Sequence, residues 1–247
     1  PDDGDEITAL ENNGNRLLIF KNRSMYRWTF GQTEADRLIG IGTQSQECVK
    51  TNFDLGITFF ANEYGAYAYK GGRPELISRS IQIWFDNVPA ADVDMFAAET
   101  DADHYYLYLS DSMVVNRRTY TNVMAVYTIS LNAWTIYTLT SPIRVMAKLI
   151  VSESEDIYFG SNTGRVYQWN IGLTDDSGGA SENTATPVAA EIRTKEHMLD
   201  FPNTVDIYNI DIISNPGTQT TIFAIINGRD PVPLGDLRDR VTSFTTN

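Results

Sequence analysis

Residues 57–69 read Ile57-Thr58-Phe59-Phe60-Ala61-Asn62-Glu63-Tyr64-Gly65-Ala66-Tyr67-Ala68-Tyr69 and give the clearest indication of the fold. Apolar and β-branched residues run up to Phe60, a polar segment ending in Gly65 follows, and aromatic residues then return at alternate positions. Alternation with a period of two is typical of β-strands, and Asn and Gly between two such runs mark a hairpin. The stretch therefore predicts two antiparallel strands joined by a tight turn.

The same pattern of strand, polar turn and aromatic return strand occurs at two other places. Residues 17–28 form one repeat, with Phe20 at the end of its first strand, and residues 156–169 form another, with Phe159 in that place. Phe20 and Phe60 are 40 residues apart, and Phe60 and Phe159 are 99 apart, which leaves room for one further unit around Tyr108. Repeats of about 40–50 residues, each a small antiparallel meander, are typical of a β-propeller.

We therefore predict an all-β fold in which residues 1–172 form β-propeller blades. About four blades fit in this chain, which makes it either a small ring or part of a larger one. Helix should account for less than about 10% of the residues, because helical periodicity is nearly absent. We expect four aromatic residues to be buried in the blades, the three phenylalanines at equivalent positions: Phe20, Phe60, Tyr108 and Phe159.

The composition changes after Ile171. Residues 173–187 are rich in Gly, Ser, Thr and Asp, which predicts a flexible linker. Residues 188–247 again contain apolar β-type runs, including Val205–Ile212 and Thr221–Ile226, but without the aromatic pattern of the blades. We interpret them as a small β-sandwich-like module, with a closing blade as the alternative.

Charge and cysteine content exclude several classes of protein. The 247 residues carry 19 Lys and Arg against 32 Asp and Glu, a net charge of −13, which counts against a nucleic-acid-binding surface. Cys48 is the single cysteine, so it is expected to begin a strand as a free thiol, and neither an internal disulfide nor a Cys-rich zinc site can form. No apolar run approaches the ~18 residues of a membrane-spanning helix.

Few residues suggest catalysis. His104 and His197 each lie in a polar stretch that is best read as a solvated turn, and no Gly-x-Ser-x-Gly motif accompanies them. Acidic residues gather at two places where they could form a glycosidase pair or, in the first group, bind calcium: Asp92, Asp94, Asp101 and Asp103, and then Glu153, Glu155 and Asp156. Because both groups are expected between strands, we interpret them as solvated loop residues. The sequence thus predicts no catalytic residue, no cofactor-binding residue and no metal ligand.

Rows of aromatic residues could stack against sugars or against neighbouring blades. These residues are Tyr67, Tyr69, Tyr105, Tyr106, Tyr108, Tyr167 and Trp169. Because flat rings at alternate strand positions fill the space between facing sheets, we interpret them as packing between blades. A sugar-binding platform is the alternative.

One further pattern occurs in the first 80 residues, in which a predicted strand is followed by a glycine near aromatic residues and then by a Gly-Gly pair. The stretches that carry it are Gly4–Leu10, Leu17–Lys21, Ser24–Tyr26, Ile39–Gly42, Ile57–Ala61, Tyr64–Gly72 and Pro74–Ser78. This pattern resembles the β-propeller virion proteins of bacteriophage tails, the packaged-DNA stabilisation and tail-hub or nozzle proteins of short-tailed phages. Residues 191–195 and the strands after them are similar to the module that often follows those propellers. Members of this group commonly have more blades than this chain supplies.

The resemblance implies a structural virion protein and no enzyme. Its copies would form a cyclic homo-oligomer, six-fold by resemblance, around the DNA exit channel, and would contact other virion tail or portal-adaptor proteins. It would be assembled in the host cytoplasm and reside in the virion tail, where it would help to retain or pass the genome. Acidic walls repel phosphates, so DNA would pass without specific binding.

Two other functions stay open. The first alternative is a carbohydrate- or receptor-binding β-propeller on a phage tail or cell surface, which needs an exposed pocket. The second is an enzyme of glycoside or lactone type, which needs buried carboxylates close to one another.

Overall fold

The computed structural model describes residues 4–151 and 154–169, together with six short strands farther along the chain. Strands account for 55% and helix for 8% of the described residues, which confirms the all-β class predicted from the sequence. The chain divides into two compact units, Pro1–Ala190 and Glu191–Asn247. The four blade-like repeats all fall in the first unit.

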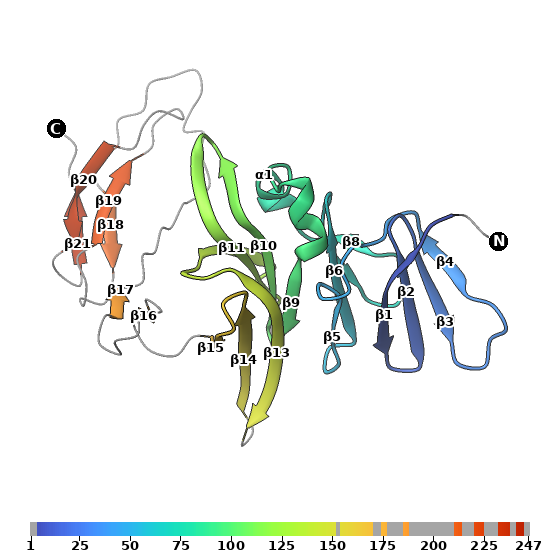
Figure 1. Ribbon diagram of the computed structural model, residues 1–247. Helices are drawn as coiled ribbons and strands as arrows, with labels where there is room; N and C mark the ends of the chain where they lie inside the picture. The colour runs from blue at the N-terminus through green and yellow to red at the C-terminus, as the bar shows by residue number, and fades with distance from the viewer. Residues whose placement is uncertain are drawn as a thin grey trace. The chain divides into compact units, whose positions relative to one another are not determined.

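Four antiparallel sheets follow one another along the first unit, and each strand pairs with its neighbours in sequence (Figure 1). The first sheet contains β1 (Ile7–Asn13), β2 (Arg16–Lys21), β3 (Met25–Thr29) and β4 (Asp36–Ile39). The second contains β5 (Lys50–Asn52), β6 (Ile57–Asn62), β7 (Gly65–Tyr69) and β8 (Glu75–Leu76). The third contains β9 (Ala97–Thr100), β10 (His104–Val115), β11 (Arg118–Thr128) and β12 (Ala133–Thr138). The fourth contains β13 (Ile143–Val151), β14 (Ser154–Ser161) and β15 (Val166–Gln168).

Helical structure among the described residues is confined to the connection between the second and third sheets. It consists of the 3₁₀ turn η1 (Arg79–Ile81), the short helix α1 (Gln82–Phe85) and the 3₁₀ turn η2 (Ala90–Met95). Within the described part of the chain, no helix is long and apolar enough to cross a membrane.

Aromatic side chains join the first three sheets. Phe20 of β2 and Phe60 of β6 are both fully buried, and their ring centres lie 5.0 Å apart between the first and second sheets. The neighbouring Phe59 points to the opposite side of β6 and stacks on Tyr105 of β10, with ring centres 4.9 Å apart. Consecutive aromatic residues of one strand thus fill two different interfaces, as the period of two requires.

The third and fourth sheets are joined in the same way. Trp169, just after β15, lies 5.9 Å from Tyr106 of β10 and 5.1 Å from Tyr137 of β12, measured between ring centres. Tyr106 is buried in a small core together with Tyr108. The second and third sheets thus each have one side toward the preceding sheet, here called the predecessor side, and one side toward the following sheet, here called the successor side.

The expected equivalence of the three phenylalanines is wrong for Phe20. Phe60 pairs with Tyr67 and Phe159 with Tyr167 across their hairpins, and both phenylalanines stack on these tyrosines. Phe20 instead pairs with Met25 on the other side of its sheet. Phe60 and Phe159 lie two residues before the last residue of their strands, whereas Phe20 lies one residue before it. Because side chains alternate along a strand, this difference of one residue places Phe20 on the opposite side of its sheet.

Burial agrees with expectation for three of the four aromatic residues. Phe20, Phe60 and Tyr108 are at most 1% exposed. Phe159 is only half-buried at the side of the second small core, which corrects the prediction of full burial.

The polar triplet Ser110–Ser112 lies inside β10, where the register shifts between Tyr108 and Ser110. Cys48 does not begin a strand, because it lies in the turn before Lys50. Its thiol is free and fully buried, and its backbone oxygen accepts a 2.8 Å hydrogen bond from the hydroxyl of Tyr105.

The C-terminal part differs in detail from the expected boundaries. The stretch 173–187, predicted as a linker, contains a hairpin of β16 (Thr174–Asp176) and β17 (Ala185–Pro187), and the division between the units falls after residue 190. In the second unit, β18 (Ile210–Ile213) pairs with β21 (Val241–Phe244), and β19 (Thr220–Ala224) pairs with β20 (Val232–Leu237). The first five residues of the run predicted at 205–212 lie outside the described residues.

Replacing Phe60 with Ala should lower the free energy of unfolding of the first unit by about 3–5 kcal/mol, because the ring is fully buried between two others. All four tryptophans precede residue 190, so tryptophan fluorescence during urea unfolding reports on this unit. Phe30→Ala is the matched control, since Phe30 is 83% exposed, and should change the value by less than about 0.5 kcal/mol. Equal losses in the two variants would contradict the packing described here.

Candidate interaction surface

Alternate residues of β2 point to opposite sides of the first sheet. Leu18 and Phe20 are fully buried toward the second sheet. Leu17 and Ile19 lie between them in sequence, are half-buried, and point the other way. Directly paired residues on neighbouring strands share one side of a sheet. The outer face of the first sheet is therefore made of Leu10, Leu17, Ile19, Tyr26 and Trp28.

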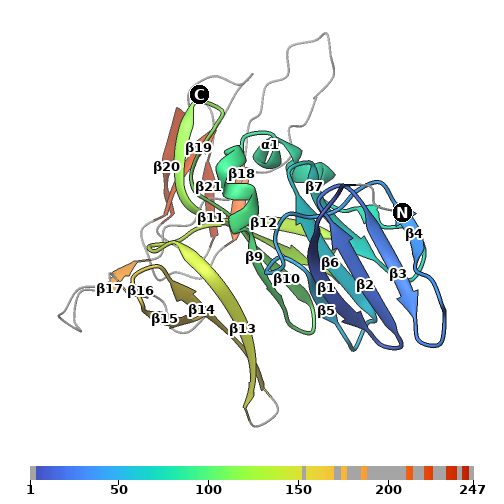
Figure 2. The ribbon, with the colours of Figure 1, turned by 45° about the vertical axis from the view of Figure 1, so that its right-hand side comes forward.

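This outer face is apolar and partly open to solvent, and Figure 2 looks obliquely onto it. Leu10 is 49% exposed, and the other four members are half-buried. Two cations stand beside them. The Lys21 ammonium lies 5.6 Å from the centre of the Tyr26 ring, and the exposed Arg37 is the partner of Tyr26 on β4. The first sheet thus presents an apolar surface with positive charge at its side.

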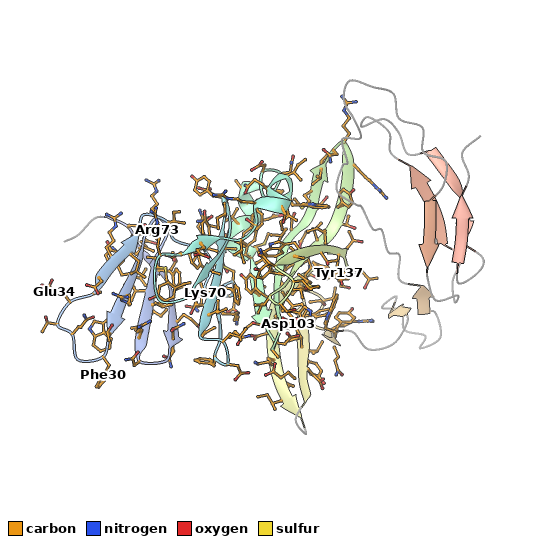
Figure 3. All side chains as sticks on the ribbon, turned by 180° about the vertical axis from the view of Figure 1, so that it is seen from behind. Phe30, Glu34, Lys70, Arg73, Asp103 and Tyr137 are labelled. Carbon is orange, nitrogen blue, oxygen red and sulfur yellow. The ribbon has the colours of Figure 1, made fainter. Side chains whose placement is uncertain are left out.

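A shallow hollow of about 370 Å³ lies at one end of this face. Its lining comes from the β1–β2 hairpin and from the end of β3. The lining residues are Asn12, Gly14, Asn15, Arg16, Leu17, Trp28 and, just after β3, Phe30. Phe30 meets Trp28 edge to face at 6.0 Å, and Figure 3 shows it at the far end of the first sheet. Trp28 is held in place because its indole nitrogen donates a 2.9 Å hydrogen bond to the backbone oxygen of Gln32.

The fourth sheet also carries an apolar outer face. Met146 and Ile157 are buried toward the third sheet, so the residues next to them in each strand, and the residues paired with those, point away from it. These residues are Val145, Ala147, Leu149, Tyr158 and, on β15, Val166. Three of them are strongly exposed: Val145 at 47%, Leu149 at 49% and Val166 at 72%. Asp156 pairs with Leu149 on the same side, so this face has a negative charge within it.

The aromatic rows considered as a sugar platform are mostly used for packing. Five of their members are at most 5% exposed: Tyr67, Tyr69, Tyr105, Tyr106 and Tyr108. Their rings contact facing sheets or cross-strand partners, as Tyr105 does with Phe59. Buried rings offer no face to a sugar, so the packing interpretation is confirmed for these five.

Asp101 organises the turn between β9 and β10. One carboxylate oxygen, Oδ1, accepts hydrogen bonds from the backbone nitrogens of Asp103 and His104, at 2.9 and 2.7 Å. The other oxygen accepts a 2.7 Å bond from the hydroxyl of Tyr106, and His104 Nδ1 lies 3.1 Å from Oδ1. His104 is therefore the first residue of β10 and contacts a carboxylate, whereas the sequence suggested a solvated turn.

The chemistry of this group argues against an activated nucleophile. Burial raises the pKa of Tyr106, and the hydrogen bond to Asp101 raises it further. A tyrosine with a raised pKa keeps its proton, which is the opposite of what nucleophilic catalysis requires. Asp101 is thus explained as a turn-forming residue whose carboxylate is satisfied by local donors.

The remaining acidic candidates do not assemble into one site. Asp103 accepts two hydrogen bonds from Ser130, which lower its pKa and fasten the β9–β10 turn to the β11–β12 turn. Asp92 in η2 accepts a 2.5 Å bond from the hydroxyl of Ser110, while Asp94 is exposed. Glu155 lies in β14 and pairs with Lys148 at 3.0 Å. No group of three or more His, Cys, Asp or Glu side chains suited to a metal ion occurs among the described residues. Glu153 and His197 lie outside them.

An ion pair that no sequence pattern indicates joins the third and fourth sheets. Arg144 of β13 donates two hydrogen bonds to Asp111 of β10, at 2.8 and 2.5 Å, and the Tyr108 hydroxyl donates a third at 2.6 Å. The bonds from Arg144 lower the pKa of Asp111. No local signal connects two residues 33 positions apart, because their contact exists only after the sheets have packed.

Asp111→Asn should lower the free energy of unfolding at pH 7 by about 1 kcal/mol, since a bidentate but partly exposed pair is lost. The pKa of Asp111 is lower in the folded than in the unfolded protein, so its contribution is complete above about pH 4 and disappears as the pH falls further. Urea unfolding at pH 7 and pH 3 measures this, with the exposed Asp54→Asn as control. A deficit that is the same at both pH values would contradict the role of the ion pair.

Neither a model of a known protein family nor a curated protein sequence matches this chain, so the phage resemblance drawn from its residues stays a prediction.

Proposed function

We propose that this chain is a structural protein of a phage tail or head-to-tail assembly, where it forms part of a ring around the DNA exit channel. The observation that carries the proposal is the pair of open apolar faces at the two end sheets of the first unit. Adjacent exposed apolar residues on one face of a sheet are typical of contacts between proteins. Such contacts are the main requirement of a protein that works by assembly.

The blade-like order of the four sheets supports the same proposal. Each sheet is a meander of consecutive strands, and each packs face to face with the next through aromatic side chains. This is the way in which propeller blades are built and stacked. We therefore propose that the four sheets are blades of a β-propeller and that the resemblance to virion propeller proteins reflects this shared construction.

Charge supports a passive relation to DNA. The net charge of −13 disfavours adhesion to phosphates, which suits the wall of a conduit through which DNA moves. The polar clusters around Asp101 and Asp111 are accounted for by hydrogen bonds within the third sheet and between the third and fourth sheets. The proposed protein is therefore a component of the virion and not an enzyme.

Electron microscopy of the purified full chain tests this proposal. We expect cyclic rings of several copies and no retention of duplex DNA in a gel-shift assay at about 150 mM salt, because contacts to phosphates need cationic surface. Mass spectrometry of purified phage particles encoding the chain should detect it in stoichiometric amounts. A protein that stays monomeric at about 100 μM and is missing from the particles would exclude the structural function.

The carbohydrate- or receptor-binding alternative is favoured by the hollow at Trp28 and Phe30. Exposed aromatic faces beside asparagine and arginine side chains are suited to stacking on sugar rings. A titration with oligosaccharides, monitored by tryptophan fluorescence, should show no saturable change if the structural function holds. A saturable change that is lost in Phe30→Ala, but retained in Tyr64→Ala at an exposed ring in the turn between β6 and β7, would favour the alternative.

A further inference from the structure

We propose that the outer face of the first sheet docks on the outer face of the fourth sheet of a second copy, head to tail. This inference rests on the proposed function, because it names the surfaces through which the structural protein would assemble.

The first argument comes from equivalent positions in the repeats. Ile19 and Tyr26 form the same cross-strand pair in the first sheet that Phe60 and Tyr67 form in the second. In the second sheet this pair faces the preceding sheet, where Phe60 contacts Phe20. Ile19 and Tyr26 therefore occupy positions that, one repeat later, are covered by another sheet.

The second argument comes from the next cross-strand pair. Trp28 pairs with Leu17 in the first sheet, as Tyr69 pairs with Thr58 in the second. Tyr69 is fully buried against the first sheet, whereas Trp28 at the corresponding position borders an open hollow. The outer face of the first sheet thus has the composition of a covered interface but lies open in this chain.

The fourth sheet offers the matching surface. In the three interfaces inside the unit, the successor side of one sheet always meets the predecessor side of the next. The outer face of the fourth sheet is a successor side, and Val145, Leu149 and Val166 make it apolar. Packing it on the first sheet of another copy would repeat the arrangement already present three times.

Charge is complementary between the two faces. Lys21 and Arg37 stand on the outer face of the first sheet, and Asp156 stands on that of the fourth. Opposite charges at corresponding faces favour head-to-tail contact and disfavour contact between two identical faces. A second copy is the occupant, because the second and third sheets separate the first from the fourth in both Figure 1 and Figure 2. A head-to-tail contact closes into a ring when the rotation between copies permits it.

Disulfide cross-linking of the full chain tests the contact. Leu10→Cys places a thiol on the outer face of the first sheet, and Ala147→Cys places one on that of the fourth, both at exposed positions. The native Cys48 is fully buried, and burial raises its pKa, so it should not take part. We expect covalent dimers when the two variants are mixed under mild oxidation, and at least tenfold fewer when either variant is oxidised alone.

Other patterns would overturn the inference. Cross-linking of Leu10→Cys with itself would show that two first sheets face each other, and absence of all cross-links would show that another segment or protein covers these faces. Rings in electron microscopy without the mixed cross-link would refute this contact but leave the structural function intact. If the mixed cross-link formed in open filaments and the protein were missing from virions, the contact would be supported and the structural function would be refuted.

A charge substitution provides an independent measurement. Leu10→Glu should raise the dissociation constant of self-association at least tenfold, measured by sedimentation, because it places a carboxylate in an apolar contact. Leu131→Glu is the matched control, since Leu131 is 73% exposed in the turn between β11 and β12. Circular dichroism checks that both variants remain folded. Equal dissociation constants for Leu10→Glu and the unsubstituted chain would overturn the proposal.

Discussion

Packing of aromatic rings between consecutive sheets is the interaction on which the rest of the first unit depends. Phe20 meets Phe60 at the first interface, and Phe59 stacks on Tyr105 at the second. The apolar side of a sheet has to be buried against another element, so each sheet needs a neighbour on its apolar sides. Among the described sheets, the first and the fourth each pack on one neighbour and keep a second apolar face that another sheet could cover.

Polar contacts fix how the packed sheets are aligned. Apolar surfaces attract without direction, whereas hydrogen bonds require particular atoms to meet. Two hydrogen bonds join the loop between β4 and β5 to the third sheet and the residue before it. The hydroxyl of Ser45 donates to the backbone oxygen of Phe96, just before β9, and the hydroxyl of Tyr105 in β10 donates to the backbone oxygen of Cys48. The ion pair of Asp111 with Arg144 does the same between the third and fourth sheets. Asp101, Asp103 and Glu155, which could suggest catalysis, instead bond to residues of their own sheets and turns.

The proposed structural function rests on surfaces that these interactions leave open. Hydrogen bonds within and between the sheets account for the described polar clusters, and the buried aromatic rows fill the interfaces. Among the described residues, the two apolar outer faces and the hollow beside Trp28 are open to solvent. We propose that the outer faces serve assembly, because apolar faces of complementary charge favour contact, and that the acidic balance of the chain disfavours adhesion to nucleic acid.

Most strands and hairpins of the first unit could be predicted from the sequence, because alternation and turn residues are local properties of the chain. The burial of Phe60, Phe20 and Tyr108 could be predicted as well, since large apolar residues within strands seldom stay exposed. That Phe20 and Phe60 face each other across an interface follows from the packing of the sheets, because moving a residue by one position along a strand reverses the side to which its side chain points. The partnership of Asp111 with Arg144 was likewise decided by packing, since it joins sheets that the chain brings together only on folding.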